Sequence, residues 1–414
     1  MKGGGATDCN FFATFALIFA FRMDFFFDIS PLAVMLFEAS LLASVIALVI
    51  FLWRILPVHR KRRADKCRDR ADNVPTLPAS VIVYSNDQSS ELETLLPQLL
   101  GQDYAPGFEV IVVNEGESPR VRAVVDELQL RHSNLYLTFT PDGARNLSRK
   151  KLALTLGIKA ARHPVAVMTS AGASIPSALW LGSMMRHFAA DNHTELVLGI
   201  AAPPHGDDTA PWKRIRSFDL AVDTLSWVAD ALGGRPWRGT EYNLAYRRDT
   251  FFRNKGFSRH LNLRGGDDDI FISEIATPAN TEVELSDESV VEVPGANHPR
   301  TAIDRNTRRR FTRRFVRRRP RLFNAVGWWL YFLAPVGAIT GACMTPSNGF
   351  GWLCALVCLI CWALVAMVWR NALTAMRGRP LMLTLPVTAG LRPVRKVMGW
   401  AISRLHRGKR YTWE

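Results

Sequence analysis

The distribution of apolar residues divides the chain into three long apolar stretches and a central part built of short apolar runs. Residues 31–53 are apolar apart from one glutamate and two serines, and residues 326–344 and 350–369 contain no charged side chain. A helix needs about 20 residues, at ~1.5 Å per residue, to cross the ~30 Å hydrocarbon layer of a membrane. The pattern therefore predicts three transmembrane helices, with buried core helices as the alternative.

Between the first two apolar stretches, short apolar runs alternate with segments whose leucines and alanines recur at helical spacing. The runs lie at residues 80–84, 108–113, 134–139 and 165–168. Strands separated by single helices form parallel sheets with helices on both faces, and near-continuous apolar strands indicate burial on both sides. We therefore predict an α/β domain with a mostly parallel sheet over residues 79–304.

Positive charge is concentrated beside the apolar stretches. The net charge is +15, but residues 54–70, 305–321 and 370–414 contain 28 Lys and Arg and three acids, which leaves the rest of the chain at −10. Nucleic-acid binders place their basic surface on the folded domain, so we expect no nucleic-acid partner. Basic residues beside membrane spans stay on the cytoplasmic side. We therefore predict a multi-pass protein of the cell inner membrane whose central domain faces the cytoplasm.

The same pattern assigns the remaining segments. We expect a basic juxtamembrane linker at residues 54–78 and an arginine-rich juxtamembrane segment at residues 305–322. A cytoplasmic tail at residues 370–414 is predicted to carry an amphipathic helix that lies on the membrane surface. Residues 1–30 are left unassigned, because the apolar run at 11–21 is too short to span a membrane and lacks a clear cleavage site.

The sequence lacks the motifs of common cofactors. No Gly-x-Gly-x-x-Gly follows the first predicted strand and no Gly-x4-Gly-Lys-Ser/Thr occurs, so dinucleotide and P-loop sites are not predicted. The nine histidines have no paired spacing, and Cys358 and Cys361 lie in a charge-free apolar stretch. Neither pattern predicts a zinc site.

Five motifs, in order along the chain, carry a family resemblance. They are SVIVYSNDQSSELETLLPQLLGQDY, FEVIVVNEGES, MTSAGASIPSALWL, GTEYNLAYRRDTFFRNKGF and LRGGDDDIFI. As a set, over roughly residues 80–293, they resemble the inverting family-2 glycosyltransferases, and the flanking spans are similar to membrane-anchored bacterial members. The resemblance implies a GT-A (nucleotide-diphospho-sugar transferase) domain with a nucleotide sugar lying over the strand ends.

On the acceptor side, the resemblance implies a general base. Asp267 aligns with the family's base position, and Asp268 and Asp269 beside it favour a raised pKa through like-charge repulsion, which suits a base. An acidic helix start, where carboxylates meet the helix dipole, is the alternative. Asn243 and Tyr246 are expected to line the acceptor side, with a plain buried strand as the alternative.

On the donor side, the resemblance places the nucleotide near the loops after the first two strands. Ser85, Asn86 and Glu115 lie in these loops and are predicted to bind the donor. Lys150 and Lys151 open the helix before the fourth strand and are predicted to reach the diphosphate. A solvated basic face is the alternative for the two lysines.

The fourth strand ends where the resemblance expects a metal-binding Asp-x-Asp motif, but Ser170-Ala171-Gly172 stands there. Mg²⁺ and Mn²⁺ sites rely on carboxylates plus substrate phosphates. Ser170 and Gly172 are therefore assigned to the donor site without a metal, and no divalent cofactor is assigned. Glu241 also replaces a family glycine, and the Gln-x-x-Arg-Trp motif of processive members is absent, so a processive polymerase is not expected.

These features predict a membrane-anchored, inverting glycosyltransferase that moves one sugar from a nucleotide sugar to a lipid-linked or cell-envelope glycan acceptor. The alternative is a catalytically inactive pseudoglycosyltransferase that acts as a membrane scaffold and binds a partner. The missing Asp-x-Asp favours the scaffold, and the intact acidic cluster favours catalysis.

Overall fold

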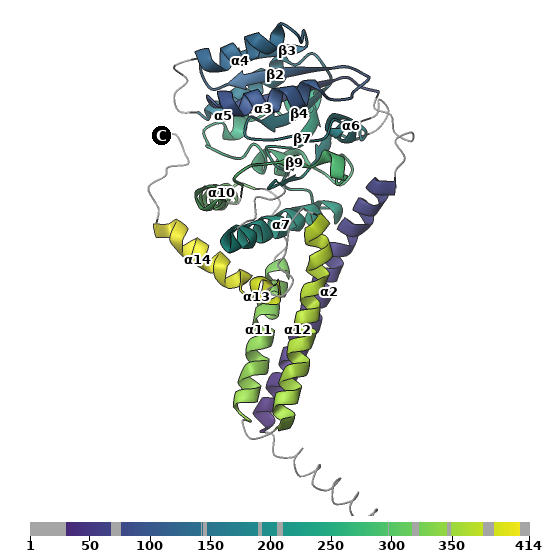
Figure 1. The fold of residues 1–414 in the computed structure, drawn as a ribbon, viewed down its shortest axis with the longest axis vertical. Coiled ribbons are helices and arrows are strands. Elements are labelled where there is room, and N and C mark those ends of the chain that lie inside the picture. Colours follow the sequence, from purple (N-terminus) through teal and green to yellow (C-terminus); the bar gives the residue numbers. More distant parts are fainter. Residues whose placement is uncertain are drawn as a thin grey trace, which may run out of the picture. The chain divides into compact units, whose positions relative to one another are not determined.

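The chain forms two compact units, drawn as ribbons in Figure 1. The helical unit contains residues up to 52, 322–369 and 383–394, and the sheet unit contains residues 53–321, 370–382 and those from 395 on. The predicted N-terminal segment, the end of the tail and parts of the basic segments lie outside the residues that are described. The computed structural model describes residues 30–67, 76–141, 143, 147–188, 193–204, 210–296, 298–316, 323–345, 349–375 and 385–405.

The sheet unit is built on a seven-stranded sheet with the order β3-β2-β1-β4-β7-β5-β8. β1 (Ala79–Ser85) pairs in parallel with β2 (Phe108–Asn114) and with β4 (Val165–Ser170), whereas β7 (Leu244–Arg247) runs antiparallel to β4 and to β5. The other strand pairs are parallel, which confirms the predicted α/β fold with a mostly parallel sheet. The remaining strands are β3 (Leu135–Phe139), β5 (Leu196–Leu198), β8 (Thr281–Val283) and the separate pair β6 (Ala201–Ala202) and β9 (Val291–Glu292).

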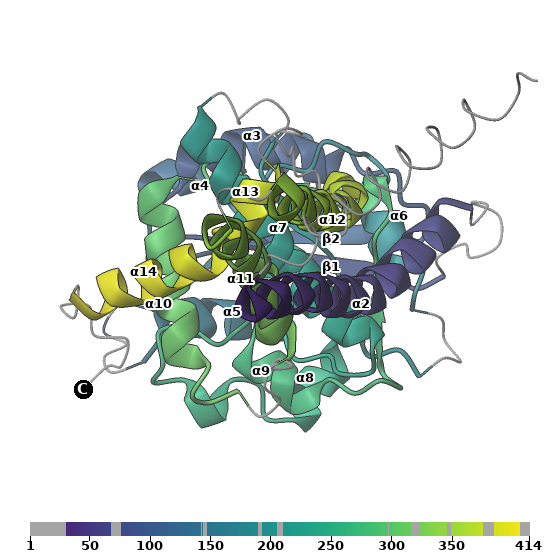
Figure 2. The same ribbon diagram turned by 90° about the horizontal axis from the view of Figure 1, so that it is seen from below.

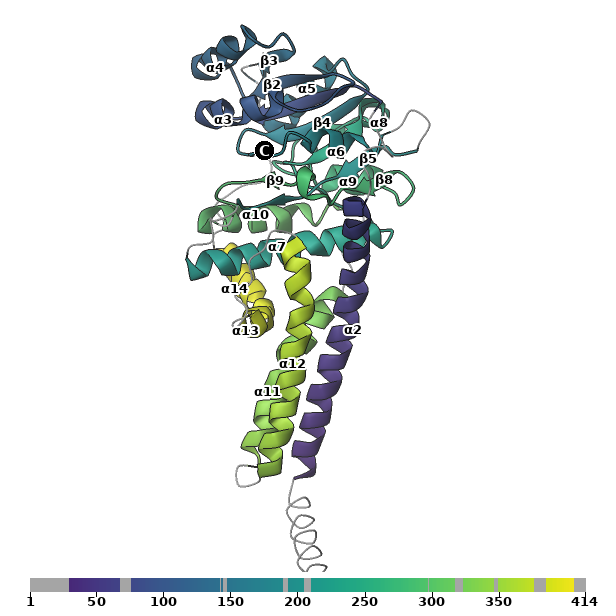
Figure 3. The ribbon, with the colours of Figure 1, turned by 45° about the vertical axis from the view of Figure 1, so that its right-hand side comes forward.

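Helices cover both faces of the parallel half of the sheet, as Figure 3 shows. Side chains alternate along a strand, so Val81 and Val83 of β1 face one core while Ile82 faces the other. On the Ile82 side, the helix α5 packs so closely on the sheet that a Cβ on its Gly157 would lie 2.7 Å from Ile82 Cγ2. Leucines of α3 and valines of α4 fill the first core, and α5 covers the second. These helices are α3 (Ser89–Leu100), α4 (Pro119–Gln129) and α5 (Arg149–Ala160).

The second half of the sheet unit supplies further helices. The longest, α7 (Pro211–Leu232), buries Phe218, Val222 and Leu225 on one face. The predicted amphipathic helix forms as α14 (Arg392–Leu405), and Arg395 and Lys396 pair with Asp219 and Asp223 of α7. The others are α6 (Trp180–Met185), α8 (Arg248–Arg253), α9 (Ile270–Ile275) and α10 (Pro299–Thr312), with 3₁₀ turns at Ser258–His260 and Asp287–Ser289.

The helical unit contains α11 (Phe323–Cys343), α12 (Gly349–Ala375), the short α13 (Leu385–Gly390) and the first part of α2 (Pro31–Cys67). Within the described residues, α2, α11 and α12 are long and apolar enough to cross a membrane, as the sequence predicted. They lie side by side, as Figure 2 shows from below. The Phe51 ring lies 4.9 Å from Trp328 and 5.0 Å from Trp369, so large aromatic side chains fill the space between the three helices.

The first helix extends further than the sequence predicted. It continues to Cys67, so the linker expected at residues 54–78 begins as helix. Arg54 Nη1 lies 2.9 Å from Asp230 Oδ1, and Arg62 Nη2 lies 2.5 Å from Asp287 Oδ1, both within the sheet unit. The basic residues of this part have acidic partners far along the chain, and these contacts favour an ordered helix.

Candidate active site

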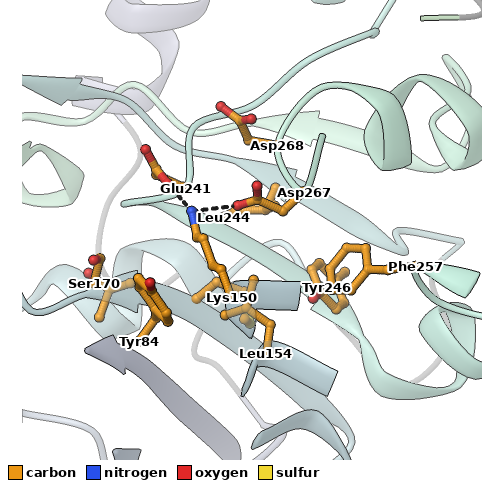
Figure 4. A pocket seen from close by; sticks show the side chains of 12 residues that line it. Tyr84, Lys150, Leu154, Ser170, Glu241, Leu244, Tyr246, Phe257, Asp267 and Asp268 are labelled. Atoms are coloured by element: carbon orange, nitrogen blue, oxygen red, sulfur yellow. Dashed lines mark hydrogen bonds and ion pairs between the residues drawn. The ribbon is translucent and has the colours of Figure 1, made fainter. Parts of the chain in front are cut away.

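A pocket lies at the carboxyl ends of β1 and β4, beside β7 (Figure 4). The carboxyl ends of neighbouring parallel strands meet at one edge of a sheet, so side chains distant in sequence converge there. The enclosed space is about 10 Å³, which is room for about one water molecule. Its lining residues are Tyr84, Lys150, Leu154, Met168, Thr169, Ser170, Glu241, Leu244, Tyr246, Phe257, Asp267 and Asp268.

Lys150 bridges two carboxylates in this pocket. Its ammonium bonds to Glu241, lies 2.8 Å from Asp267 Oδ2 and stands 5.3 Å above the Tyr84 ring. Burial by itself would lower the pKa of Lys150, but the charges of Asp267 and Glu241 outweigh it and raise the pKa well above its usual value. Figure 4 shows both contacts as dashed lines. Lys150 is therefore a fixed positive charge at the strand ends.

Lys151 points away from the pocket. Its Nζ donates to His260 O at 2.6 Å and lies 2.9 Å from His260 Nδ1, and the side chain is fully buried. Burial lowers the pKa of Lys151 to about 8 and that of His260 to about 4. Successive residues of an α-helix point about 100° apart. The structure thus separates two lysines that the sequence analysis placed together at the donor, and the place of Lys151 there is corrected.

The three adjacent carboxylates have different surroundings. Asp267 is held by Lys150. Asp269 is the N-cap of α9, where its Oδ1 accepts a hydrogen bond from Ile270 N at 2.7 Å and its other oxygen accepts one from the Thr312 hydroxyl. Asp269 therefore stabilises the start of α9. For this residue the structure agrees with the alternative interpretation, an acidic helix start.

Asp268 is the member of the cluster whose side chain has no hydrogen-bond partner among the described residues. It lines the pocket with 9 % of its surface exposed. Burial, and then the charges of Asp269 and Asp267, raise its pKa to about 6. A carboxylate that titrates near neutral pH and keeps its lone pairs available meets the requirements of a general base.

Gly266 gives the acidic loop its shape. Its φ is +105°, and a Cβ at this position would lie 2.6 Å from Ile270 Cδ1. A side chain here would strain the backbone and press on the first residue of α9. The glycine therefore allows Asp267 and Asp268 to turn into the pocket while Asp269 caps the helix.

Asn114 joins the two loops of the predicted nucleotide region by hydrogen bonds. It is not among the site residues predicted from the sequence. Its Oδ1 accepts from Asp87 N at 3.0 Å and its Nδ2 donates to Gly116 O at 2.9 Å. Ser85 is fully buried, and its Oγ accepts from Gln88 N at 3.3 Å, so it holds the first loop in shape. A polar residue that ends an apolar strand was the available signal for Asn114.

Two other predicted donor residues lie at this edge of the sheet. Glu115 Oε1 accepts a hydrogen bond from the Tyr84 hydroxyl at 2.5 Å, which places this carboxylate beside the pocket. Asn86 is exposed in the loop after β1. Both stand at the carboxyl ends of neighbouring strands, where ligands of such sheets bind.

The two residues predicted for the acceptor side lie in different places. Asn243 is fully buried; its Oδ1 accepts from Trp180 Nε1 at 3.1 Å, and its Nδ2 donates to Ile200 O at 2.9 Å and Ser289 O at 2.7 Å. Its acceptor role is corrected, because the amide joins three segments and has no face left for a ligand. Tyr246, 1 % exposed, forms part of the pocket wall.

The end of β4 does not provide a metal-ligand set. Ser170 lines the pocket, and a Cβ on Gly172 would meet nothing closer than Gln88 Nε2 at 3.7 Å. Among the described residues, no group of three or more His, Cys, Asp or Glu could hold a metal ion. At the end of β4, the Ser170 hydroxyl and the Gly172 backbone do not provide the carboxylates that a divalent cation needs.

α10 brings a further cation to the pocket. Arg308 Nη2 donates to Glu241 Oε1 at 2.8 Å, whereas Lys150 bonds to the other oxygen, Oε2. The charges of Arg308 and Lys150 lower the pKa of Glu241 well below its usual range, although burial alone would raise it. From the sequence alone, this stretch is predicted only as a juxtamembrane segment, because Glu241, the partner of Arg308, lies 67 residues away along the chain.

Comparison with known proteins gives one family and several similar structures. The model of glycosyl transferase family 21 matches residues 40–408. No curated protein sequence matches significantly. The mannosyltransferase PcManGT from Pyrobaculum calidifontis, solved in complex with GDP-Man and Mn2+, is similar at 18 % identity over 86 % of this chain and 99 % of that chain, with a TM-score of 0.47. TarS 1–349 of S. aureus is similar at 14 % identity over 81 % of this chain and 93 % of that chain, with a TM-score of 0.39.

Proposed function

We propose that this chain, which belongs to glycosyl transferase family 21, transfers one sugar from a nucleotide-diphosphate sugar to an acceptor held at a membrane surface. Family membership confirms the glycosyltransferase expected from the sequence, and the finer assignment to family 2 is not confirmed. The observation that carries the proposal is a fixed cation, Lys150, beside a titratable carboxylate, Asp268, at the carboxyl edge of the sheet.

Lys150 and Arg308 are the proposed partners of the donor diphosphate. Both cations pair with the Glu241 carboxylate. We expect the donor diphosphate to bind at the same position between them. A diphosphate that displaces Glu241 would form charge-assisted hydrogen bonds with both cations. Negative charge grows on the leaving diphosphate as the sugar bond breaks, and cations already in position stabilise it.

The acceptor hydroxyl is the nucleophile in the proposed reaction. Its oxygen attacks the anomeric carbon, the bond from that carbon to the diphosphate oxygen breaks, and the electron pair leaves with the nucleoside diphosphate. Attack opposite the leaving group inverts the anomeric configuration. Asp268 accepts the hydroxyl proton. We place the base at Asp268 in preference to Asp267, because the Asp267 carboxylate is engaged by Lys150 and serves to orient it.

The acceptor is proposed to be a lipid-linked or cell-envelope glycan. Three helices long and apolar enough to cross a membrane support an acceptor that is itself held in the lipid. The basic residues beside them support a location in the inner membrane with the sheet unit in the cytoplasm.

The inactive scaffold is the second candidate. The small enclosed space of the pocket and the absence of a carboxylate at Ser170 and Gly172 favour it. Titration calorimetry of the full-length protein in detergent, with UDP- and GDP-sugars and with or without Mn²⁺, tests donor binding, and release of nucleoside diphosphate tests turnover. Donor binding with release supports the enzyme, and no donor binding under any of these conditions supports the scaffold.

A further inference from the structure

α10 turns a basic stripe toward the rest of the sheet unit. Arg305, Arg308, Arg309 and Thr312 recur at the i, i+3, i+4 and i+7 positions of one helix face. In a helix that packs on a core this stripe is normally apolar. Its direction is fixed at two points, because Thr312 donates to Asp269 and Arg308 donates to Glu241. The stripe therefore faces the loops that carry the acids of the candidate active site.

Arg238 meets this stripe from the loop before β7. Its side chain is only 6 % exposed, yet its guanidinium forms no ion pair or hydrogen bond with any described residue, and its buried Nε has no acceptor. Burying such a group without a partner is unfavourable. A buried arginine that only stabilises the fold normally donates its N–H groups to a carboxylate or a carbonyl oxygen. Among the described residues, the Arg238 guanidinium lies 6.0 Å from the centre of the Trp237 ring and forms no ion pair.

Arg305 and Arg309 extend the same cluster. Arg305 Nη1 donates to Ala296 O at 2.8 Å, but its buried Nε has no acceptor, and the side chain forms no ion pair with the described residues. Arg309 lies 4.0 Å from Asp223, a carboxylate that also pairs with Lys396.

Packing brings the three arginines to one place: Arg305 and Arg309 are one turn apart on α10, and Trp237, next to Arg238, packs against the same apolar cluster as Phe311 of α10. Burial lowers the pKa values of Arg305 and Arg309, and the nearby charge of Arg238 lowers both further. Solvent reaches Arg309, whose side chain is 24 % exposed.

We propose that Arg238, Arg305 and Arg309 bind a phosphate group carried by the acceptor, which would then be a phosphorylated lipid or glycolipid. The inference rests on the proposed function, because it names the class of acceptor for the same reaction. A phosphate offers several oxygens at once, and the planar donor forks of arginine match that arrangement.

The position of the cluster separates this phosphate from that of the donor. Lys150 and Arg308 pair with Glu241 and form the donor's cations, whereas no ion pair joins Arg238, Arg305 or Arg309 to Glu241 among the described residues. Arg238 lies beside the proposed base, because Gly239 N, the next residue along the chain, donates to Asp268 O at 2.8 Å. A phosphate held by the cluster would place the rest of the acceptor next to the proposed base. Positioning of this kind brings the nucleophile within reach of the base and raises the rate.

Dodecyl phosphate, a simple lipid phosphate, is the probe for the test. Its affinity for the full-length protein in dodecyl maltoside is measured by calorimetry, with inorganic phosphate, UDP and GDP in separate arms. The variants are Arg238→Gln and Arg305→Gln. Arg235→Gln is the matched control, because Arg235 lies in the same loop and is exposed. Arg305→Gln changes a partly exposed helix position and keeps the test valid if Arg238→Gln does not fold.

We expect both variants to bind dodecyl phosphate more than tenfold more weakly than wild type and the control, a change of about 1.4 kcal/mol. Affinity for UDP and GDP should stay within about twofold. Unchanged dodecyl phosphate binding overturns the proposal. Parallel loss of UDP and GDP binding overturns it in favour of a donor role, and inorganic phosphate bound as tightly as dodecyl phosphate overturns it in favour of a free-phosphate site. Arginine-dependent dodecyl phosphate binding without any donor binding would keep this site while the transferase proposal fails.

Discussion

Replacing Asp268 with asparagine should greatly reduce turnover and stabilise the protein at the same time. The pKa of Asp268 rises from 3.8 to about 6 on folding, mainly through burial. Its charged form is therefore disfavoured in the folded state relative to the unfolded chain. At ~1.36 kcal/mol per pKa unit, ionisation of this one group reduces the free energy of unfolding by about 3 kcal/mol.

The sign of the pH dependence follows from the direction of the shift. A raised carboxyl pKa favours folding when the group is protonated, so its stabilising effect is complete below pH 3.8 and is lost as the pH rises through 6. At pH 7 the wild type carries the full cost of the charge, and Asp268→Asn removes it. At pH 4 the two proteins should have similar stability.

Thermal unfolding of the full-length protein in detergent at pH 4 and pH 7, together with nucleoside diphosphate release, measures both effects. We expect Asp268→Asn to unfold at a higher temperature than wild type at pH 7 and to lose at least roughly 10²-fold in turnover. Wild-type turnover should fall about tenfold per pH unit below pH 6, as the base becomes protonated.

Asp267→Asn is the matched control for this experiment. It removes one of the two carboxylate partners of Lys150 and should lower the unfolding temperature at pH 7. Normal turnover in Asp268→Asn, combined with a large loss in Asp267→Asn, would return the base to Asp267. A lower unfolding temperature for Asp268→Asn at pH 7 would contradict the burial argument itself.

Three further outcomes follow from the structure. Lys150→Gln should weaken nucleotide-sugar binding more than tenfold in calorimetry. Lys151→Gln should leave binding near wild type and lower the unfolding temperature. Equal losses of binding in the two variants would contradict the separation of the two lysines. The double variant Ser170→Asp with Gly172→Asp should make donor binding depend on Mn²⁺, because it adds the carboxylates that such a cation needs. The Gly172 backbone lies outside the left-handed region and accepts a side chain. Donor binding by the double variant that does not change with Mn²⁺ would show that these positions do not face the diphosphate. Reporter fusions should place the loop between α11 and α12 outside the cell membrane and the C-terminus inside, and a periplasmically active reporter at the C-terminus would refute this topology.

The architecture could be predicted from the sequence because its signals are local. The three apolar stretches and the valine-rich strands appear within windows shorter than 25 residues, and the structure confirms the apolar helices and the mostly parallel sheet. The edge of the sheet that carries the pocket followed from the same reasoning, since parallel strands bring their carboxyl ends together whatever their side chains. The acidic run at residues 267–269 was visible for a similar reason, as consecutive residues.

The roles within the site were decided by contacts that the sequence does not contain. Lys150 and Glu241 are 91 residues apart, and Arg308 and Glu241 are 67 apart, so their pairing depends on how α5, α10 and the loop before β7 pack. Adjacent residues then acquire unlike roles. Lys150 faces the pocket and Lys151 faces His260, while Asp269 caps a helix and Asp268 lines the pocket. Burial and neighbouring charge set the pKa and the available lone pairs of each group, and both are properties of the packed fold.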